Sequence, residues 1–176
     1  MTKPSFDLRC YFVTGQGPDV VERARQAAAG GAGVIQVRSK PISARELYAL
    51  SRAVAEAVHS VNPQTHVLID DRADVAAALR HEGISGVHVG QDDLDVRVVR
   101  ELLGPDAIIG LTTGTLELVQ AANEHKGVID YIGCGPFRAT PTKDSGRAPI
   151  GLDGYPELVA ASELEFAVTL PLLELQ

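Results

Sequence analysis

The sequence has few of the residues that mark several protein classes. It contains two cysteines, no tryptophan and 5% aromatic residues, which excludes a disulfide-rich secreted scaffold. Its 16 Lys and Arg against 23 Asp and Glu give a net charge of -7, which argues against nucleic acid as a general partner. No apolar run approaches the roughly 20 residues that cross a bilayer, and residues 1–9 have no hydrophobic signal core. We therefore expect a cytoplasmic protein that binds neither membranes nor nucleic acid.

The residues that commonly bind metals through sulfur or imidazole are also sparse. Cys10 and Cys134 each lie in an apparent strand without a partner at short spacing, so both are expected to be buried, reduced thiols. The five histidines are scattered and do not suggest a metal cluster.

What the sequence does contain is a regular alternation of short apolar runs and helical patterns. The 176 residues suit one domain with a single sizeable core. Strands are expected at 9–13, 33–37, 66–69, 86–89, 107–111 and 129–134, with a further strand possible at 166–170. Helices are expected at 19–29, after Ser43, and at 73–81, 95–103 and 116–125. Ser43 with Glu46 three positions later forms a capping-box pattern, and Asp19 suits an N-cap.

This alternation predicts an α/β fold with parallel strands and right-handed crossovers, either a barrel or an open doubly wound sheet. No G-x-G-x-x-G follows the first strand, which disfavours a dinucleotide-binding sheet. Polar residues follow strand after strand, as in a (β/α)8 barrel, whose active site lies in those loops. We predict a TIM (β/α)8-type barrel of about six to seven strands, apparently incomplete at its C-terminus. Residues 1–176 would form a single domain with an atypical tail from about residue 163.

The segment Val34-Ile35-Gln36-Val37-Arg38-Ser39-Lys40 indicates a buried strand that ends in polar and cationic groups. Because side chains alternate across a strand, Gln36, Arg38 and Lys40 are predicted to share one face. Two converging cations need an anion, and the remaining motifs favour a pyrophosphate. The alternative is an edge strand with ordinary surface charges.

Aspartates follow the third and fourth expected strands, in Ile69-Asp70-Asp71-Arg72-Ala73-Asp74 and in Gly90-Gln91-Asp92-Asp93. In a parallel barrel these loops are neighbours, and Mg2+ favours one or two carboxylates together with phosphate oxygens and waters. We predict that Asp71 and Asp93 bind Mg2+. Helix capping is the alternative for such aspartates, and we assign Asp74 and Asp95 mainly to it.

Two further loops carry hydroxyl groups and a cation. The fifth strand leads into Thr112-Thr113-Gly114-Thr115, which suits phosphate oxygens or a helix cap equally well. The sixth leads into a long loop with glycines, Thr140, Thr142 and Lys143, an inventory typical of a phosphate-binding lid. A flexible surface loop is the alternative, because such residues are also generic in loops.

Together these segments resemble the thiamine-phosphate synthase family. The motifs that carry the resemblance follow the order found in the family over residues 8–160: Tyr11-Phe12-Val13-Thr14, Gln36-Val37-Arg38-Ser39-Lys40, Ile69-Asp70-Asp71-Arg72, Gly86-Val87-His88-Val89-Gly90-Gln91-Asp92-Asp93, and Asp130 through Lys143. The resemblance implies a TIM barrel and a transferase. Such an enzyme joins hydroxymethylpyrimidine pyrophosphate to a thiazole phosphate, releasing pyrophosphate and forming thiamine phosphate.

The resemblance also implies a role for each matching position. Gln36 corresponds to a contact to the pyrimidine. Arg38, Lys40 and Lys143 correspond to the catalytic cations around the pyrophosphate, and Asp71 and Asp93 to the Mg2+ ligands. Thr112 stands where the family usually has a serine near the pyrophosphate, and Thr140 and Thr142 resemble contacts to the thiazole phosphate. His88 is expected to be a hydrogen-bonded, barrel-lining residue.

Two departures from the family pattern qualify this expectation. Asp70 stands where the family usually has an asparagine that contacts pyrophosphate, and an ionised Asp70 would repel that group unless it is protonated or shares the metal. The resemblance also fades after about Ser162, before two further βα units whose loops hold the thiazole phosphate. A truncated or altered-reading-frame product, or a sheet completed by a second copy of the chain, would explain this. A non-catalytic protein that binds either substrate and a thiazole tautomerase-like enzyme are the alternative functions.

Overall fold

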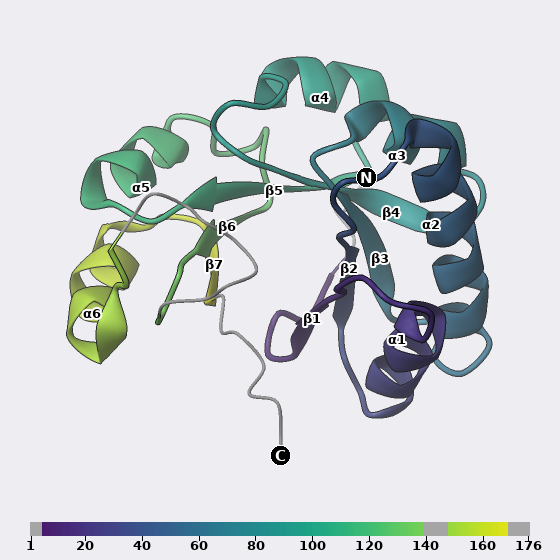
Figure 1. The fold of residues 1–176 in the computed structure, drawn as a ribbon. Helices are drawn as coiled ribbons and strands as arrows, with labels where there is room; N and C mark the ends of the chain where they lie inside the picture. The colour runs from purple at the N-terminus through teal and green to yellow at the C-terminus, as the bar shows by residue number, and fades with distance from the viewer. Residues whose placement is uncertain (1–4, 139–147, 169–176) are drawn as a thin grey trace. The chain divides into compact units, whose positions relative to one another are not determined.

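The computed structural model describes residues 5–138 and 148–168, in which seven strands and six helices alternate (Figure 1). The elements are β1 (Tyr11–Val13), α1 (Val20–Ala29), β2 (Val34–Val37), α2 (Ala44–His59), β3 (His66–Asp70), α3 (Ala73–Leu79), β4 (Ile84–Val89), α4 (Val96–Leu103), β5 (Ile108–Thr113), α5 (Leu116–Asn123), β6 (Tyr131–Cys134), α6 (Gly151–Ala161) and β7 (Glu165–Val168). The predicted alternation of strands and helices is confirmed. The helix α6 was not predicted.

The strands pair in parallel and in chain order within each of two compact units, residues 1–109 and 110–176. In the first unit β1 pairs with β2, β2 with β3, and β3 with β4. In the second unit β5 pairs with β6 and β6 with β7. A doubly wound sheet reverses its strand order at a switch point, whereas a (β/α)8 barrel keeps chain order. The fold is of the TIM-barrel type, with seven strands in the described residues.

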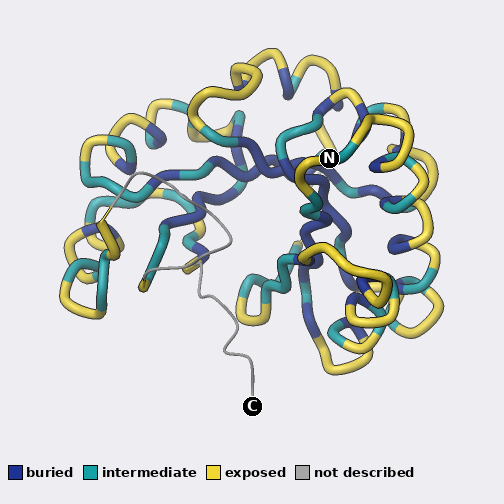
Figure 2. The backbone as a smooth tube through the Cα atoms, viewed as in Figure 1, coloured by how far each residue is buried: buried dark blue, intermediate teal, exposed yellow. Residues whose placement is uncertain are grey.

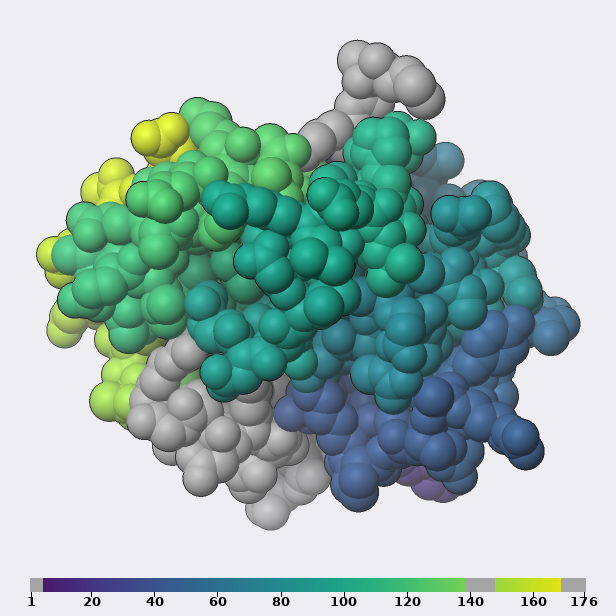
Figure 3. Space-filling view, turned by 90° about the horizontal axis from the view of Figure 1, so that it is seen from above, coloured from purple at the N-terminus to yellow at the C-terminus, as the bar shows by residue number. Residues whose placement is uncertain are grey.

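The core of the first unit lies where the helices cover the strands. Every residue of β2 is buried, as is every residue of β3 after His66 (Figure 2). Helix α2 buries Leu47, Val54 and Val58 in this core. Helix α2 contacts α3, and α3 contacts α4. Their segments, coloured blue to teal, lie side by side on the surface in Figure 3. No helix in the described part of the chain is long and apolar enough to cross a membrane.

The capping box at the start of α2 is confirmed. The Ser43 hydroxyl accepts a hydrogen bond from the Glu46 backbone N–H at 3.2 Å, and the Glu46 carboxylate accepts one from the Ser43 backbone N–H at 3.1 Å. These contacts satisfy two backbone donors that have no partner within the helix. They fix the point at which the chain leaves the loop after β2 and enters α2.

We expect Ser43→Ala to lower the free energy of unfolding by about 1 kcal/mol, because the cap is lost while the exposed surface hardly changes. Ser43→Thr keeps a hydroxyl acceptor and is the matched control. Urea denaturation followed by circular dichroism measures both. Equal midpoints for the alanine variant and the natural protein would show that the cap does not stabilise the fold.

The expected aspartate caps differ from one another. Asp95 caps α4 as predicted, accepting a hydrogen bond from the Arg97 backbone N–H at 2.8 Å. Asp19 occupies the N-cap position of α1 but makes no side-chain cap bond and instead accepts from Arg23 at 2.8 Å. Asp74 lies in the first turn of α3 rather than at its cap. An arginine within reach therefore replaces the backbone as the partner of Asp19.

The two cysteines have different environments. Cys134 is buried at the end of β6, and its sulfur lies 2.7 Å from the Thr113 hydroxyl. The prediction that Cys10 is also buried in a strand was wrong, because β1 begins one residue later and Cys10 is exposed. The chain that leads into β1 passes close to Gly33, where an added Cβ would lie 2.2 Å from the Asp7 carbonyl oxygen.

Candidate active site

Polar side chains gather at the carboxyl ends of β2, β3 and β4, all within the first unit. Because these strands are parallel, the loops that follow them lie on one edge of the sheet. A pocket of about 580 Å³ opens there. It is lined by Val37, Ser39, Lys40, Pro41, Ile42, Leu47, Asp70, Asp71, Arg72 and Asp93.

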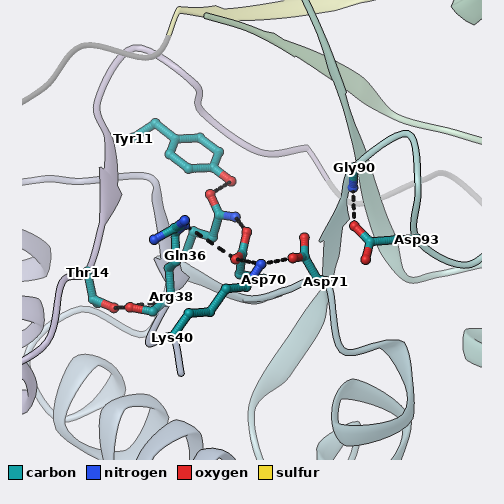
Figure 4. Close-up of polar contacts among 9 residues, drawn as sticks. All are labelled: Tyr11, Thr14, Gln36, Arg38, Lys40, Asp70, Asp71, Gly90 and Asp93. Carbon is teal, nitrogen blue, oxygen red and sulfur yellow. Dashed lines mark hydrogen bonds and ion pairs between the residues drawn. The ribbon is translucent and has the colours of Figure 1, made fainter. Parts of the chain in front are cut away.

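The cationic segment after β2 is held by a residue of the preceding strand's loop. The Thr14 hydroxyl donates to the Arg38 carbonyl at 3.0 Å and accepts from the Arg38 backbone N–H at 2.9 Å (Figure 4). The strand β2 ends at Val37, in agreement with the expected strand at 33–37, and Arg38 and Lys40 follow it. Gln36, Arg38 and Lys40 all contact Asp70, as expected of side chains that share one face. Lys40 lines the pocket, whereas Gln36 and Arg38 are not among its lining residues.

Asp70 connects these groups. One of its oxygens, Oδ1, accepts a hydrogen bond from Gln36 Nε2 at 2.6 Å, and the Gln36 Oε1 accepts from the Tyr11 hydroxyl at 3.2 Å. The other oxygen, Oδ2, lies 3.1 Å from Lys40 Nζ and 3.5 Å from Arg38 Nε. Oδ2 is buried and makes no directed hydrogen bond, so its contacts with the two cations are those of an ion pair. Asp70 thus joins three of the predicted substrate ligands to one carboxylate.

Asp71 has an unusual backbone conformation that places its carboxylate in the pocket. Its φ of 60° is the only positive value among non-glycine residues in the described ranges. Its backbone N–H donates to the His88 carbonyl at 2.8 Å, and the Arg72 backbone N–H then turns back to the Asp70 carbonyl at 2.7 Å. Aspartate tolerates this left-handed region better than most residues, and such conformations concentrate at functional sites. The Asp71 carboxylate forms an ion pair with Lys40.

Asp93 lines the same pocket from the loop after β4. Its Oδ2 accepts a hydrogen bond from the Gly90 backbone N–H at 2.7 Å. This contact shapes the loop and leaves a carboxylate at the pocket. A Cβ at Gly90 would lie 2.9 Å from the Asp93 Oδ2, so a larger residue there would displace this carboxylate.

Asp74, a further acid near the pocket, forms an ion pair with Arg72. Arg72 donates to both oxygens of Asp74, at 2.8 and 2.5 Å, and these hydrogen bonds lower the pKa of Asp74. Asp74 therefore stays charged near neutral pH with its charge already balanced. It does not line the pocket, in agreement with its exclusion from the predicted metal ligands.

The oxygen ligands present fit Mg2+ better than a metal that needs nitrogen or sulfur. Three aspartates line the pocket, and Asp70 is engaged by Gln36, Arg38 and Lys40. Asp71 and Asp93 are then the candidate ligands, which matches the one or two carboxylates that Mg2+ takes beside waters and phosphate oxygens. In the described residues there is no cluster of three or more His, Cys, Asp or Glu side chains that could hold a metal by itself. A Mg2+ ion at this pocket would take its remaining ligands from waters and phosphate oxygens.

The remaining predicted residues lie elsewhere in the chain. Thr112 is part of β5 and belongs to the second unit. Thr140, Thr142 and Lys143 lie outside the described residues. His88 is buried in β4 as expected. Sequence reasoning gave no role to Tyr11 and Thr14, although both lie in a quoted motif, because their partners are about 25 positions away.

Comparison with known proteins identifies the family. The family model described as thiamine monophosphate synthase matches residues 10–171. The chain belongs to this family. Thiamine-phosphate synthase of Corynebacterium jeikeium strain K411 is 69% identical over 162 residues, covering 91% of this chain and 74% of the relative. The enzyme of the same name from Corynebacterium efficiens is 66% identical over 166 residues, covering 92% and 76%.

Comparison with solved structures agrees with this family assignment. Thiamine phosphate pyrophosphorylase from Pyrococcus furiosus matches with a TM-score of 0.75 at 28% identity. The match covers 93% of this chain and 75% of that structure. The family resemblance predicted from the ordered motifs is confirmed.

Proposed function

We propose that this chain is a thiamine-phosphate synthase, a transferase that joins hydroxymethylpyrimidine pyrophosphate to a thiazole phosphate and releases pyrophosphate. The observation that carries the proposal is the convergence of Arg38, Lys40, Asp71 and Asp93 at one edge of the sheet, in a member of the thiamine monophosphate synthase family. Lys40, Asp71 and Asp93 line one pocket, and Arg38 lies beside Asp70 of the same lining. Such a set of cations and acids suits a diphosphate with a divalent metal ion. Cytoplasmic location and self-association stay predictions.

The roles of the individual residues follow from charge and reach. Arg38 and Lys40 would bind the diphosphate oxygens, with Lys143 joining them from the loop outside the described residues. Asp71 and Asp93 would hold Mg2+, whose positive charge would offset that of the diphosphate. Lys40 contacts Asp71 in the structure, so this ammonium would exchange a carboxylate for a diphosphate oxygen when substrate binds.

The chemistry requires charge neutralisation more than proton transfer. When the bond between the pyrimidinylmethyl carbon and the diphosphate oxygen breaks, negative charge grows on the leaving group, and fixed cations nearby stabilise it. The thiazole nitrogen then attacks the stabilised pyrimidinylmethyl cation. No general base is needed for these two steps, and the roles assigned here to Arg38 and Lys40 are purely electrostatic.

The decisive experiment supplies the purified chain with both substrates and Mg2+ and measures thiamine phosphate. We expect product only when both substrates are present, with loss of product after chelation of the metal. Saturable binding of either substrate without product would support the second candidate, a non-catalytic binding protein. Reaction of the thiazole substrate alone would indicate a tautomerase.

A further inference from the structure

Three side chains from neighbouring strands form a hydrogen-bonded series that ends at Asp70. The Tyr11 hydroxyl on β1 donates to Gln36 Oε1 on β2 at 3.2 Å, and Gln36 Nε2 donates to Asp70 Oδ1 on β3 at 2.6 Å (Figure 4). Gln36 and Asp70 are only 5% and 7% exposed. Because the Gln36 amide is buried, its hydrogen-bond partners determine whether the oxygen or the NH2 group faces Tyr11 and which group faces Asp70.

The two ends of the series differ in what they can dictate. A hydroxyl both donates and accepts, so Tyr11 can satisfy either end of the Gln36 amide. A carboxylate only accepts, so Asp70 requires the NH2 end. The second oxygen of Asp70, Oδ2, lies 3.1 Å from Lys40 Nζ and 3.5 Å from Arg38 Nε. Two cations beside this oxygen favour a charged carboxylate over a carboxylic acid that could donate a hydrogen bond. Lys40 and Arg38 therefore keep Asp70 in the form that only accepts hydrogen bonds.

We propose that Asp70 is a positioning residue that fixes the orientation of the Gln36 amide and so selects an aminopyrimidine over an oxopyrimidine. This inference rests on the proposed function, in which Gln36 contacts the pyrimidine. A 4-aminopyrimidine presents a donor beside an acceptor ring nitrogen, whereas its 4-oxo analogue presents an acceptor beside a ring N–H donor. An amide of fixed orientation matches one pattern and opposes the other, and a mismatched buried polar group lowers affinity strongly.

An asparagine at position 70 would not impose this choice, because its own amide can present either oxygen or NH2 to Gln36. The aspartate at this position, where the family usually has asparagine, therefore fixes the orientation of Gln36 in a way that asparagine would not. Its charge is engaged by Arg38 and Lys40 and its side chain is 8% exposed, so it acts on the substrate through Gln36.

The test compares the dissociation constants of 4-amino-2-methyl-5-hydroxymethylpyrimidine pyrophosphate and its 4-oxo analogue, measured by calorimetry in the full chain with Mg2+. We expect Asp70→Asn to lower the preference for the amino compound at least about tenfold, since Gln36 can then turn over. Asp70→Ser serves the same purpose if the asparagine variant does not fold, because its hydroxyl also accepts and donates.

Tyr11→Phe is the matched control at the other end of the series. It removes one hydrogen bond from Gln36 but leaves Asp70 in place, so both compounds should bind more weakly with a ratio within about threefold of the natural one. An unchanged ratio in Asp70→Asn, or an equal change in Tyr11→Phe, would overturn the proposal. Absence of thiamine phosphate despite selective binding would instead count against the proposed function alone.

Discussion

Replacing Asp71 with asparagine is expected to slow thiamine phosphate formation at least about a hundredfold while the protein stays folded. The substitution removes the charge of a proposed Mg2+ ligand in the pocket that also contains Lys40 and Asp93. It retains the shape of the side chain. Asparagine also tolerates the φ of 60° found at this position, so the backbone turn after β3 should persist.

The measurement is kcat/KM over a range of Mg2+ concentrations, with circular dichroism as the check on folding. Asp74→Asn is the control, because Asp74 carries the same charge three positions away, is exposed and is paired with Arg72. It should change kcat/KM by less than about threefold. Natural turnover in Asp71→Asn would remove the metal site from the proposed mechanism.

Replacing Gly86 with alanine is expected to have the largest effect on folding. A Cβ at Gly86 in β4 would lie 1.9 Å from the carbonyl oxygen of Ile108 and within 2.8 Å of its backbone nitrogen. These are backbone atoms of a strand, so the clash cannot be relieved by turning a side chain. We expect a loss of at least about 3 kcal/mol in the free energy of unfolding, or failure to obtain folded protein.

Gly15→Ala is the matched control for this prediction. An added Cβ at Gly15 would meet nothing within 4 Å, and its φ lies outside the left-handed region. This variant should be as stable as the natural chain or slightly more stable, because alanine restricts the unfolded chain. Equal urea midpoints for the two alanine variants would contradict the close approach of β4 and Ile108.

The parts of the fold that sequence predicted are those specified by local pattern. Apolar runs bounded by polar residues identified the strands, and Ser43 with Glu46 identified the start of α2. The helix α6 was missed because Gly151, Gly154 and Pro156 lower its intrinsic helical propensity, and its tertiary packing outweighs that cost. Tyr155 illustrates this packing. Its ring stacks on that of Phe137 with 6.1 Å between the ring centroids, and burial raises the pKa of Tyr155 to about 12.

The candidate site was predictable in its composition but not in its contacts. Charge and motif order indicated Arg38, Lys40, Asp71 and Asp93, and the structure brings them to one end of neighbouring strands. The Thr14 clamp on Arg38 joins residues 24 positions apart, and the bond between Gln36 and Asp70 spans 34. Such pairings depend on strand register, which single-sequence patterns do not specify.

The convergence of Gln36, Arg38 and Lys40 on Asp70 has a consequence for engineering this enzyme class. Side chains that share one partner show strong epistasis, so the effect of a double substitution will differ from the sum of its parts. Directed evolution that scans these four positions individually would discard combinations in which one replacement compensates for another. Libraries aimed at new pyrimidine substrates should therefore randomise them simultaneously.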